Sequence, residues 1–281
     1  MMGNRILVTG ATGKTGSRVT ARLQEKGIEV KIGSRKAVPS FDWNDPSGWK
    51  AVLARVSKVY IAYQPDLAVP GAVDTMRGFI NEAKKSGVAQ LVLLSGRGEK
   101  EAQEAEELVM QSGLAFTIVR AAWFFQNFSE SFFLDNVLAG EAALPLGDVK
   151  EPFVDADDIA DVVVAALTDD RHHGKVYELS GPDLLSFPEA FEIIAHASGR
   201  RIQYLRISNG EYNAAMAQMQ VPADYQWLVN YLFTEVLDGR NESLTDGVQQ
   251  ALGRKPKSFK EWAGVTAATG IWAAVAGGEQ Q

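Results

Sequence analysis

Cysteine is absent from this chain of 281 residues, which excludes disulfide bonds, thiolate nucleophiles and cysteine-ligated metals. The absence of disulfides suits a reducing compartment, and we expect a cytoplasmic protein. Histidine is scarce, at three residues, so few groups are available for acid–base or metal chemistry. Two of the three, His172 and His173, are adjacent, so their side chains diverge. We therefore expect no metal site.

Acidic residues outnumber basic residues in this chain. The 28 Lys and Arg against 35 Asp and Glu give a formal charge of −7, with no basic cluster. Nucleic-acid binding depends on Lys and Arg contacts to phosphate, so this balance argues against a nucleic-acid partner. No uninterrupted apolar run reaches the ~18 residues that a membrane-spanning helix needs, and the first residues do not have the pattern of a signal peptide. We expect no membrane partner either.

Short apolar runs alternate with amphipathic stretches in the first half of the chain. We expect strands at residues 5–9, 28–32, 58–62, 90–94 and 116–120, and a further strand at 175–180. These runs are rich in Val, Ile and Leu and lack polar alternation, as strands buried on both faces do. The pattern predicts an α/β fold with a Rossmann-type, doubly wound parallel sheet and a smaller, mainly helical C-terminal substrate lobe.

A glycine-rich segment, Thr-Gly-Ala-Thr-Gly-Lys-Thr-Gly at residues 9–16, follows the first predicted strand and opens a helix. Gly10 permits a tight turn, Gly13 lets backbone N–H groups approach a pyrophosphate, and Gly16 lets the helix lie close to the strand. The helix N-terminus then faces the anion. The spacing does not fit a Walker-type phosphate loop, because Thr15 stands where that pattern needs Gly. We expect a dinucleotide site in residues 1–150, and in 151–281 a smaller lobe that completes the sheet and covers the substrate cleft.

The end of the second strand indicates which dinucleotide is preferred. Sites for NAD place Asp or Glu there to accept from the ribose hydroxyls, whereas this chain has Arg35 followed by Lys36. The Arg35 guanidinium suits a 2′-phosphate, and Lys14 adds a second positive charge. We therefore expect NADP(H) in preference to NAD(H). In the alternative interpretation, Arg35 and Lys36 form only a solvated basic turn.

The segment after Arg35 is too short for another helix. We expect residues 41–43 to form a short third strand, with Asp42 at its end near the adenine. Trp43 and Trp49 are interpreted as packing residues.

Several blocks of sequence resemble the NmrA-like branch of atypical short-chain dehydrogenases. They are the segment 9–16, Gly-Ser-Arg at 33–35, Phe-Asp-Trp-Asn-Asp-Pro at 41–46, Leu-Val-Leu-Leu-Ser at 91–95 and Trp-Phe-Phe-Gln-Asn-Phe at 123–128. The resemblance also covers 154–160 and 174–180. It implies cofactor contacts from Gly10, Thr12, Gly13, Lys14, Thr15, Arg35, Asp42, Tyr63, Gln64, Pro65, Ser95 and Gly96. The family includes NADPH-dependent quinone reductases, reductases of cyclic iminium ions in ergot-type pathways, and regulators that bind the dinucleotide as a redox signal.

One expected feature of short-chain dehydrogenases is missing. None of the seven Tyr has Lys four residues later, so the proton-donating Tyr–Lys pair is absent. A plain ketone becomes an alkoxide after hydride transfer and needs an acid. A cationic iminium becomes a neutral amine directly, and a quinone gives a stabilised phenolate. We therefore expect a reductase of quinones or conjugated iminium ions. The alternative is a non-catalytic NADP(H) sensor that acts through a protein partner.

Two further groups are candidates for the substrate site. Glu99, Glu101 and Glu104 either place a carboxylate near the nicotinamide or form a solvated helix start, where acids are favoured. Trp123 and Phe124, in an aromatic-rich stretch after the fifth strand, either line a flat pocket or belong to the core. Asn127 is a candidate for orienting the substrate. A small-molecule substrate is expected, with a homodimer or a protein partner as further possibilities.

Overall fold

The computed structural model describes residues 5–273, and the chain divides into two compact units. Unit 1 contains the chain up to Ala122 together with Ala156–Ser180 and Thr245–Pro256. Unit 2 contains Trp123–Asp155, Gly181–Leu244 and the chain from Lys257 onward. The boundary expected at residue 150 falls inside the first segment of unit 2.

Unit 1 is built on one sheet of six parallel strands in the order β2-β1-β3-β4-β5-β8. The strands are β1 (Arg5–Thr9), β2 (Val30–Gly33), β3 (Val56–Ile61), β4 (Gln90–Gly96), β5 (Ala115–Ala121) and β8 (Lys175–Leu179). Each strand expected in the apolar runs overlaps one of them. The expected Rossmann-type α/β sheet is therefore confirmed.

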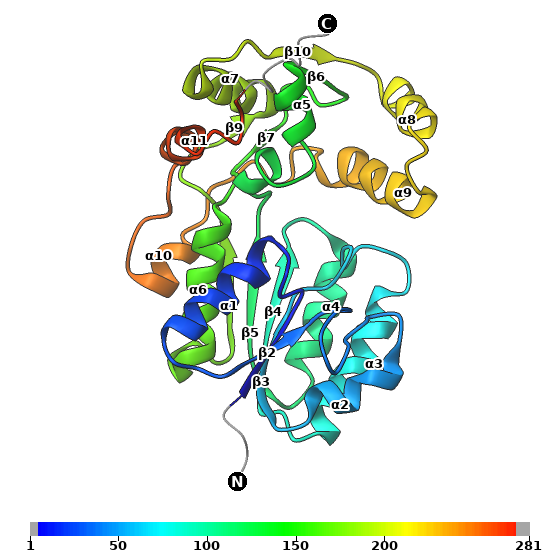
Figure 1. The fold of residues 1–281 in the computed structure, drawn as a ribbon, viewed down its shortest axis with the longest axis vertical. Coiled ribbons are helices and arrows are strands. Elements are labelled where there is room, and N and C mark those ends of the chain that lie inside the picture. Colours follow the sequence, from blue (N-terminus) through cyan, green and yellow to red (C-terminus); the bar gives the residue numbers. More distant parts are fainter. Residues whose placement is uncertain (1–4, 274–281) are drawn as a thin grey trace, which may run out of the picture. The chain divides into compact units, whose positions relative to one another are not determined.

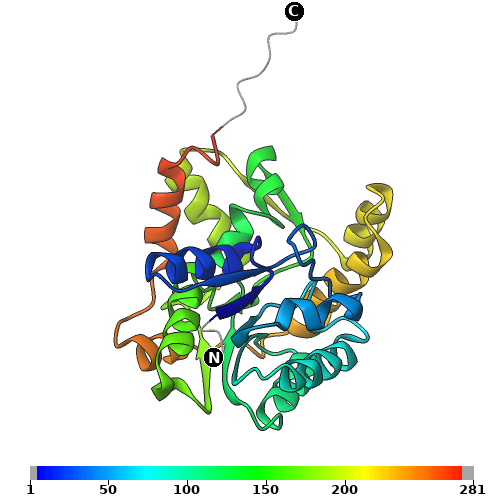
Figure 2. The same cartoon turned by 60° about the horizontal axis from the view of Figure 1, so that its bottom comes forward.

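Helices cover both faces of this sheet, which explains why its central strands are mostly apolar. The helices of unit 1 are α1 (Lys14–Glu25), α2 (Trp49–Leu53), α3 (Ala72–Lys85), α4 (Lys100–Met110), α6 (Ala156–Thr168) and α10 (Gly247–Leu252). Figures 1 and 2 show α1 and α6 together on one face and α2, α3 and α4 on the other. Leu7 and Val8 of β1 point to opposite faces, and both are fully buried.

The expected third strand at residues 41–43 is wrong. Only an isolated bridge from Asp42 to Asp45 forms there, and β1 pairs directly with β3. The Phe41 N–H donates to the Ser34 carbonyl oxygen at 3.0 Å, which turns the segment back toward the end of β2. Phe41 and Trp43 then pack edge-on against Phe79 of α3. Trp43 and Trp49 are both buried, as expected of packing residues.

Unit 2 is mainly helical. Its helices are α5 (Leu134–Ala139), α7 (Phe187–Ser198), α8 (Asn209–Gln218), α9 (Ala223–Tyr231), a π-helical turn (Leu232–Val236) and α11 (Phe259–Ala268). Two small sheets pair β6 (Glu141–Leu144) with β10 (Gln203–Arg206) and β7 (Lys150–Glu151) with β9 (Leu185–Ser186). Its core is aromatic, with Phe128 and Phe133 fully buried.

The strand order of unit 1 indicates where on its sheet a ligand would bind. Strand order reverses between β1 and β3, since the chain moves from β1 to β2 on one side and then to β3 on the other. Open α/β sheets bind ligands at such a reversal, beyond the carboxyl ends of the strands. No helix in the described part of the chain is both long enough and apolar enough to span a membrane.

Candidate functional site

The glycine-rich turn lies at the carboxyl end of β1, as the sequence predicts. Gly10 has a φ of +60°, and its carbonyl oxygen accepts from the Gly13 N–H at 2.8 Å. A Cβ on Gly16 would collide with the Gly10 carbonyl, so the helix approaches the turn more closely than any side chain permits. Gly13 is the N-cap residue of α1, and no side chain caps the helix. The first N–H groups of α1 therefore suit a phosphate.

The end of β3 adjoins this turn. The Gln64 amide lies 3.5 Å from where a Cβ on Gly13 would stand, so Gln64 faces the phosphate site. Thr15 is instead held inward, because its hydroxyl accepts from the buried Tyr60 hydroxyl at 2.9 Å. Thr12 is exposed, while Lys14 and Tyr63 are partly buried. The cofactor roles of these side chains remain predictions.

Beyond β2, Arg35 and Lys36 are both exposed on a compact turn. The Ser40 hydroxyl donates to the Arg35 carbonyl oxygen at 2.9 Å and fixes the backbone of this turn. Within residues 5–273, neither cation forms an ion pair, so both are available to an anion. Asp42 is less available, because its carboxylate accepts from the Asn44 N–H at 2.9 Å.

The carboxyl ends of β4 and β5 carry a set of paired charges, which we call the arginine side. Glu106 of α4 is 1% exposed, and Arg120 of β5 donates to both of its carboxylate oxygens, at 2.9 and 2.5 Å. The Ser95 hydroxyl donates to the same Glu106 at 2.6 Å. Arg97 and Arg120 both donate to Glu178 of β8, at 2.6 and 3.3 Å. Ser95, a predicted cofactor residue, therefore has its hydroxyl proton committed to Glu106.

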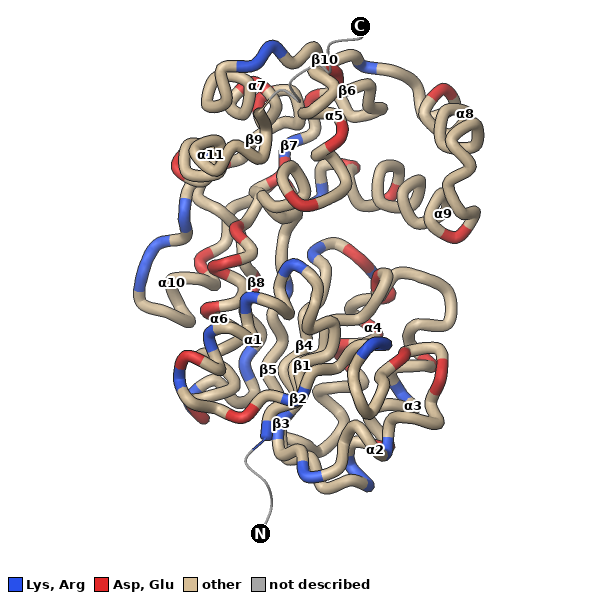
Figure 3. Tube along the Cα trace, viewed as in Figure 1, with Lys and Arg blue, Asp and Glu red and all other residues tan. Residues whose placement is uncertain are grey.

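A second group of carboxyls, which we call the acid side, lies between the segments that follow β3 and β4. Glu99 is 8% exposed and hydrogen-bonded to the Asp66 side chain. Burial, followed by the neighbouring carboxylate of Asp66, raises the pKa of Glu99 well above its ordinary value. Burial also raises the pKa of Asp66. Figure 3 shows the acidic residues of α4, among which Glu101 is partly buried. The interpretation of Glu99 as part of a solvated helix start is therefore wrong.

Unit 2 contains the other predicted substrate residues. Trp123 stacks on Phe133 and Phe233 at 6.1 and 6.2 Å between ring centroids, yet remains partly exposed. Phe124 bridges to Val154, and the Phe124 carbonyl oxygen accepts from the Asn127 N–H at 3.1 Å. These three residues lie close together along the chain in unit 2, and their substrate roles remain predictions.

Sequence reasoning missed Asp66 and the pairing of Arg120 with Glu106. Asp66 follows Gln64 in the segment after β3, so a search for acids beyond every strand end would have found it. The partners of Arg120 had no such signal, because α4 supplies one and β8 the other.

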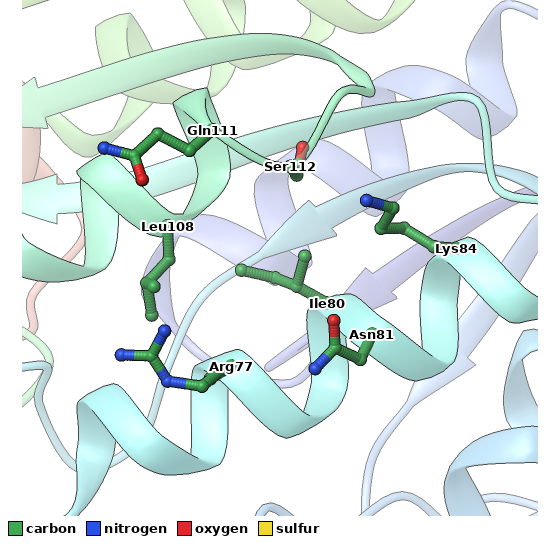
Figure 4. A pocket seen from close by; sticks show the side chains of 7 residues that line it. All are labelled: Arg77, Ile80, Asn81, Lys84, Leu108, Gln111 and Ser112. Atoms are coloured by element: carbon green, nitrogen blue, oxygen red, sulfur yellow. The ribbon is translucent and has the colours of Figure 1, made fainter.

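A groove between α3 and α4 is a separate feature of unit 1 (Figure 4). Its lining includes Arg77 and Lys84 of α3 and Leu108 of α4. No predicted site residue lines it, and it is not at the strand ends.

Two family models match the chain, each over more than half of its length. The model described as NAD(P)H-binding matches residues 10–170. The model of the NmrA-like family matches residues 100–263.

Known proteins also resemble the chain over nearly its whole length. The uncharacterized oxidoreductase YesF of Bacillus subtilis is 33% identical, over 97% of this chain and 99% of its own. The NAD(P)H azoreductase of Xenophilus azovorans is 30% identical, over 94% and 98%. Among solved structures, the NADPH complex of the quinone oxidoreductase QOR2 of Escherichia coli superposes with a TM-score of 0.76 at 21% identity, over 92% and 98%. At that identity the last likeness shows the fold alone.

Proposed function

The chain belongs to the NmrA-like family of NAD(P)H-binding oxidoreductases, and from this premise we propose that it transfers hydride from NADPH to a quinone or a conjugated iminium ion. The coarser statement, that it is an NAD(P)H-dependent reductase, follows from its relatives. The observation that carries the proposal is the glycine-rich turn, whose Gly16 leaves no room for a Cβ.

The residues present fit a bound dinucleotide. Gly10, Gly13 and the first N–H groups of α1 would hold the pyrophosphate, and Gln64 faces the same place. Arg35 and Lys36 would bind the 2′-phosphate that distinguishes NADPH from NADH. When bound, the reduced nicotinamide supplies a hydride.

The acceptor class follows from what the chain lacks. Tyr–Lys pairs at the usual spacing are absent from the sequence. Ser95, near the carboxyl end of β4, donates its hydroxyl proton to Glu106. Iminium ions, which need no proton after hydride transfer, and quinones, which give a stabilised phenolate, are therefore favoured over plain ketones.

The test is NADPH oxidation by the purified chain with a panel of a benzoquinone, an N-alkyl cyclic iminium salt and a plain ketone. Turnover of the quinone or iminium ion without turnover of the ketone is the expected result. Tight NADPH binding with no turnover of any acceptor would overturn the proposal in favour of a redox sensor.

Cofactor preference is tested by Arg35→Ala. Loss of the Arg35 guanidinium group, which would bind the 2′-phosphate, is expected to weaken NADPH binding by about tenfold and to leave NADH binding unchanged. The factor corresponds to ~1.5 kcal/mol for one hydrogen bond to a charged group. Titration calorimetry measures both affinities. Arg77→Ala, an exposed arginine on α3, is the matched control. Equal losses for both dinucleotides would show that Arg35 does not bind the 2′-phosphate.

A further inference from the structure

Glu99 has an unusual position for a residue that begins a helix. It is the N-cap of α4, yet its side chain makes no capping hydrogen bond. The carboxyl group instead packs against the α carbon of Gly96, where a Cβ would collide with it. It is hydrogen-bonded to Asp66, which comes from the segment after β3. The side chain is therefore held by two strand ends rather than by its own helix.

The surroundings of Glu99 favour its neutral form. The charges that act on it are Asp66, Glu101 of the same helix turn, and Glu106 further along α4, and all three are acidic. Asp66 is the better anion of the pair, because its Oδ1 accepts from the Ala68 N–H at 2.9 Å. We infer that the pair holds one proton, which either carboxyl group can carry. Two carboxyl groups that share a buried site do not readily ionise together.

The pair lies where the reactive end of a dinucleotide belongs. The turn at 10–16 marks the pyrophosphate, and Arg35 marks the adenosine side beyond β2. Because β3 and β4 lie on the opposite side of β1 from β2, the nicotinamide end would lie over their carboxyl ends. Gln64, two residues before Asp66, already faces the glycine-rich turn. Glu99 is 8% exposed, and the role inferred below places that exposed surface at this edge.

We propose that Glu99 is a proton donor for azo compounds, and that Asp66 positions it and returns its proton from water. This role rests on the proposed reductase function and extends it to azo compounds. In the first reduction, hydride from NADPH forms an N–H bond at one nitrogen as the N=N π bond breaks. The Glu99 carboxyl gives its proton to the other nitrogen. The products are a hydrazine, NADP⁺ and the Glu99 carboxylate, which regains a proton through the partly exposed Asp66.

The experiment compares two acceptors in the full-length protein. An azobenzene dye needs a proton, whereas an N-alkyl cyclic iminium salt becomes a neutral amine by hydride addition alone. Glu99→Gln is expected to lower kcat for the dye about a hundredfold and to change iminium reduction by less than about twofold. In the wild type, dye reduction should fall as pH rises through the pKa of the pair and should slow in D2O. Iminium reduction should do neither.

Glu107→Gln is the matched control, since Glu107 is an exposed residue of the same helix. A readout independent of turnover is the infrared band of a protonated carboxyl at neutral pH, expected in the wild type and in Glu107→Gln but absent from Glu99→Gln. Asp66→Asn removes a neighbouring carboxylate that raises the pKa of Glu99, so it should shift the fall in dye reduction, and the loss of that band, to lower pH.

The outcomes separate the two proposals. A wild type that reduces neither acceptor, and no benzoquinone either, overturns the reductase function, and the donor role with it. A wild type that reduces the iminium ion, with both acceptors slowed equally in Glu99→Gln, would leave the reductase standing and overturn the donor role. Absence of the carboxyl band would also overturn it.

Discussion

Glu99 and Glu106 are both buried at the carboxyl end of β4, but their surroundings are opposite. Glu106 faces Arg120 and the Ser95 hydroxyl, which stabilise its charge. Glu99 faces Asp66 and other acids, which make its charge costly. Burial alone therefore does not tell what a carboxyl group does. On the arginine side the carboxyl group of Glu106 ties α4 to β5 through its ion pair with Arg120, and on the acid side the pKa of Glu99 is raised well above its ordinary value.

The largest expected effect comes from removing the cation of the arginine side. Arg120→Ala leaves Glu106 buried without its ion-pair partner, which should lower the free energy of unfolding by about 3–5 kcal/mol. Urea denaturation measures the loss. Lys100→Ala breaks an exposed pair with Glu104 on the same helix and should cost less than about 1 kcal/mol. Similar losses in the two variants would mean that Glu106 does not depend on Arg120.

A smaller loss is expected when the neutral partner of Glu106 is removed. Ser95→Ala deletes a hydrogen bond of 2.6 Å to a buried carboxylate, and such bonds contribute about 2 kcal/mol. The same denaturation experiment applies, and Ser17→Ala, at an exposed serine of α1, serves as its control. If Ser95 served the cofactor instead, its loss would weaken NADPH binding and leave stability unchanged.

The smallest expected effect is that of Glu99→Gln, which should raise stability at alkaline pH, whereas the two variants above lower it. The folded-state pKa of Glu99 is raised, so the unfolded chain loses this proton first as pH rises. Stability contributed by Glu99 is therefore present below its unfolded pKa and is lost as pH rises through the folded pKa. Glu99→Gln should remove this loss, so the variant should gain stability relative to the wild type between mild acid and mildly alkaline pH. Thermal unfolding across pH measures it, and parallel pH curves for variant and wild type would contradict the shift.

Much of the fold could be predicted from the sequence, because strands buried on both faces leave continuous apolar runs. Residues 5–9 and 90–94 were found this way, and both lie within observed strands. The segment at 41–43 was misjudged, since its aromatic residues pack against Phe79 of α3, which local pattern does not reveal. Apolar composition predicts burial, but it does not say whether the partner is a strand or a helix.

The sequence predicted only the part of the candidate site that is formed by a single continuous segment. The turn containing Gly10 and Gly16 is local, so its spacing was enough. Asp66 and Glu99 come from two different segments, and the sequence of neither segment indicates that the two side chains are neighbours. Glu99 looked like an ordinary acid at a helix start, and only its three-dimensional neighbours distinguish it.

The interleaved course of the chain has a consequence for synthesis. Unit 1 receives its edge strand β8 from residues 175–179 and its last helix, α10, from residues 247–252. Gly247 lies so close to the backbone of Glu178 that a side chain there would collide with it. Domains usually fold in order as they leave the ribosome. Here the first unit to begin is still incomplete when most of the second has been made, so a nascent chain halted before residue 245 would expose the flank that α10 covers.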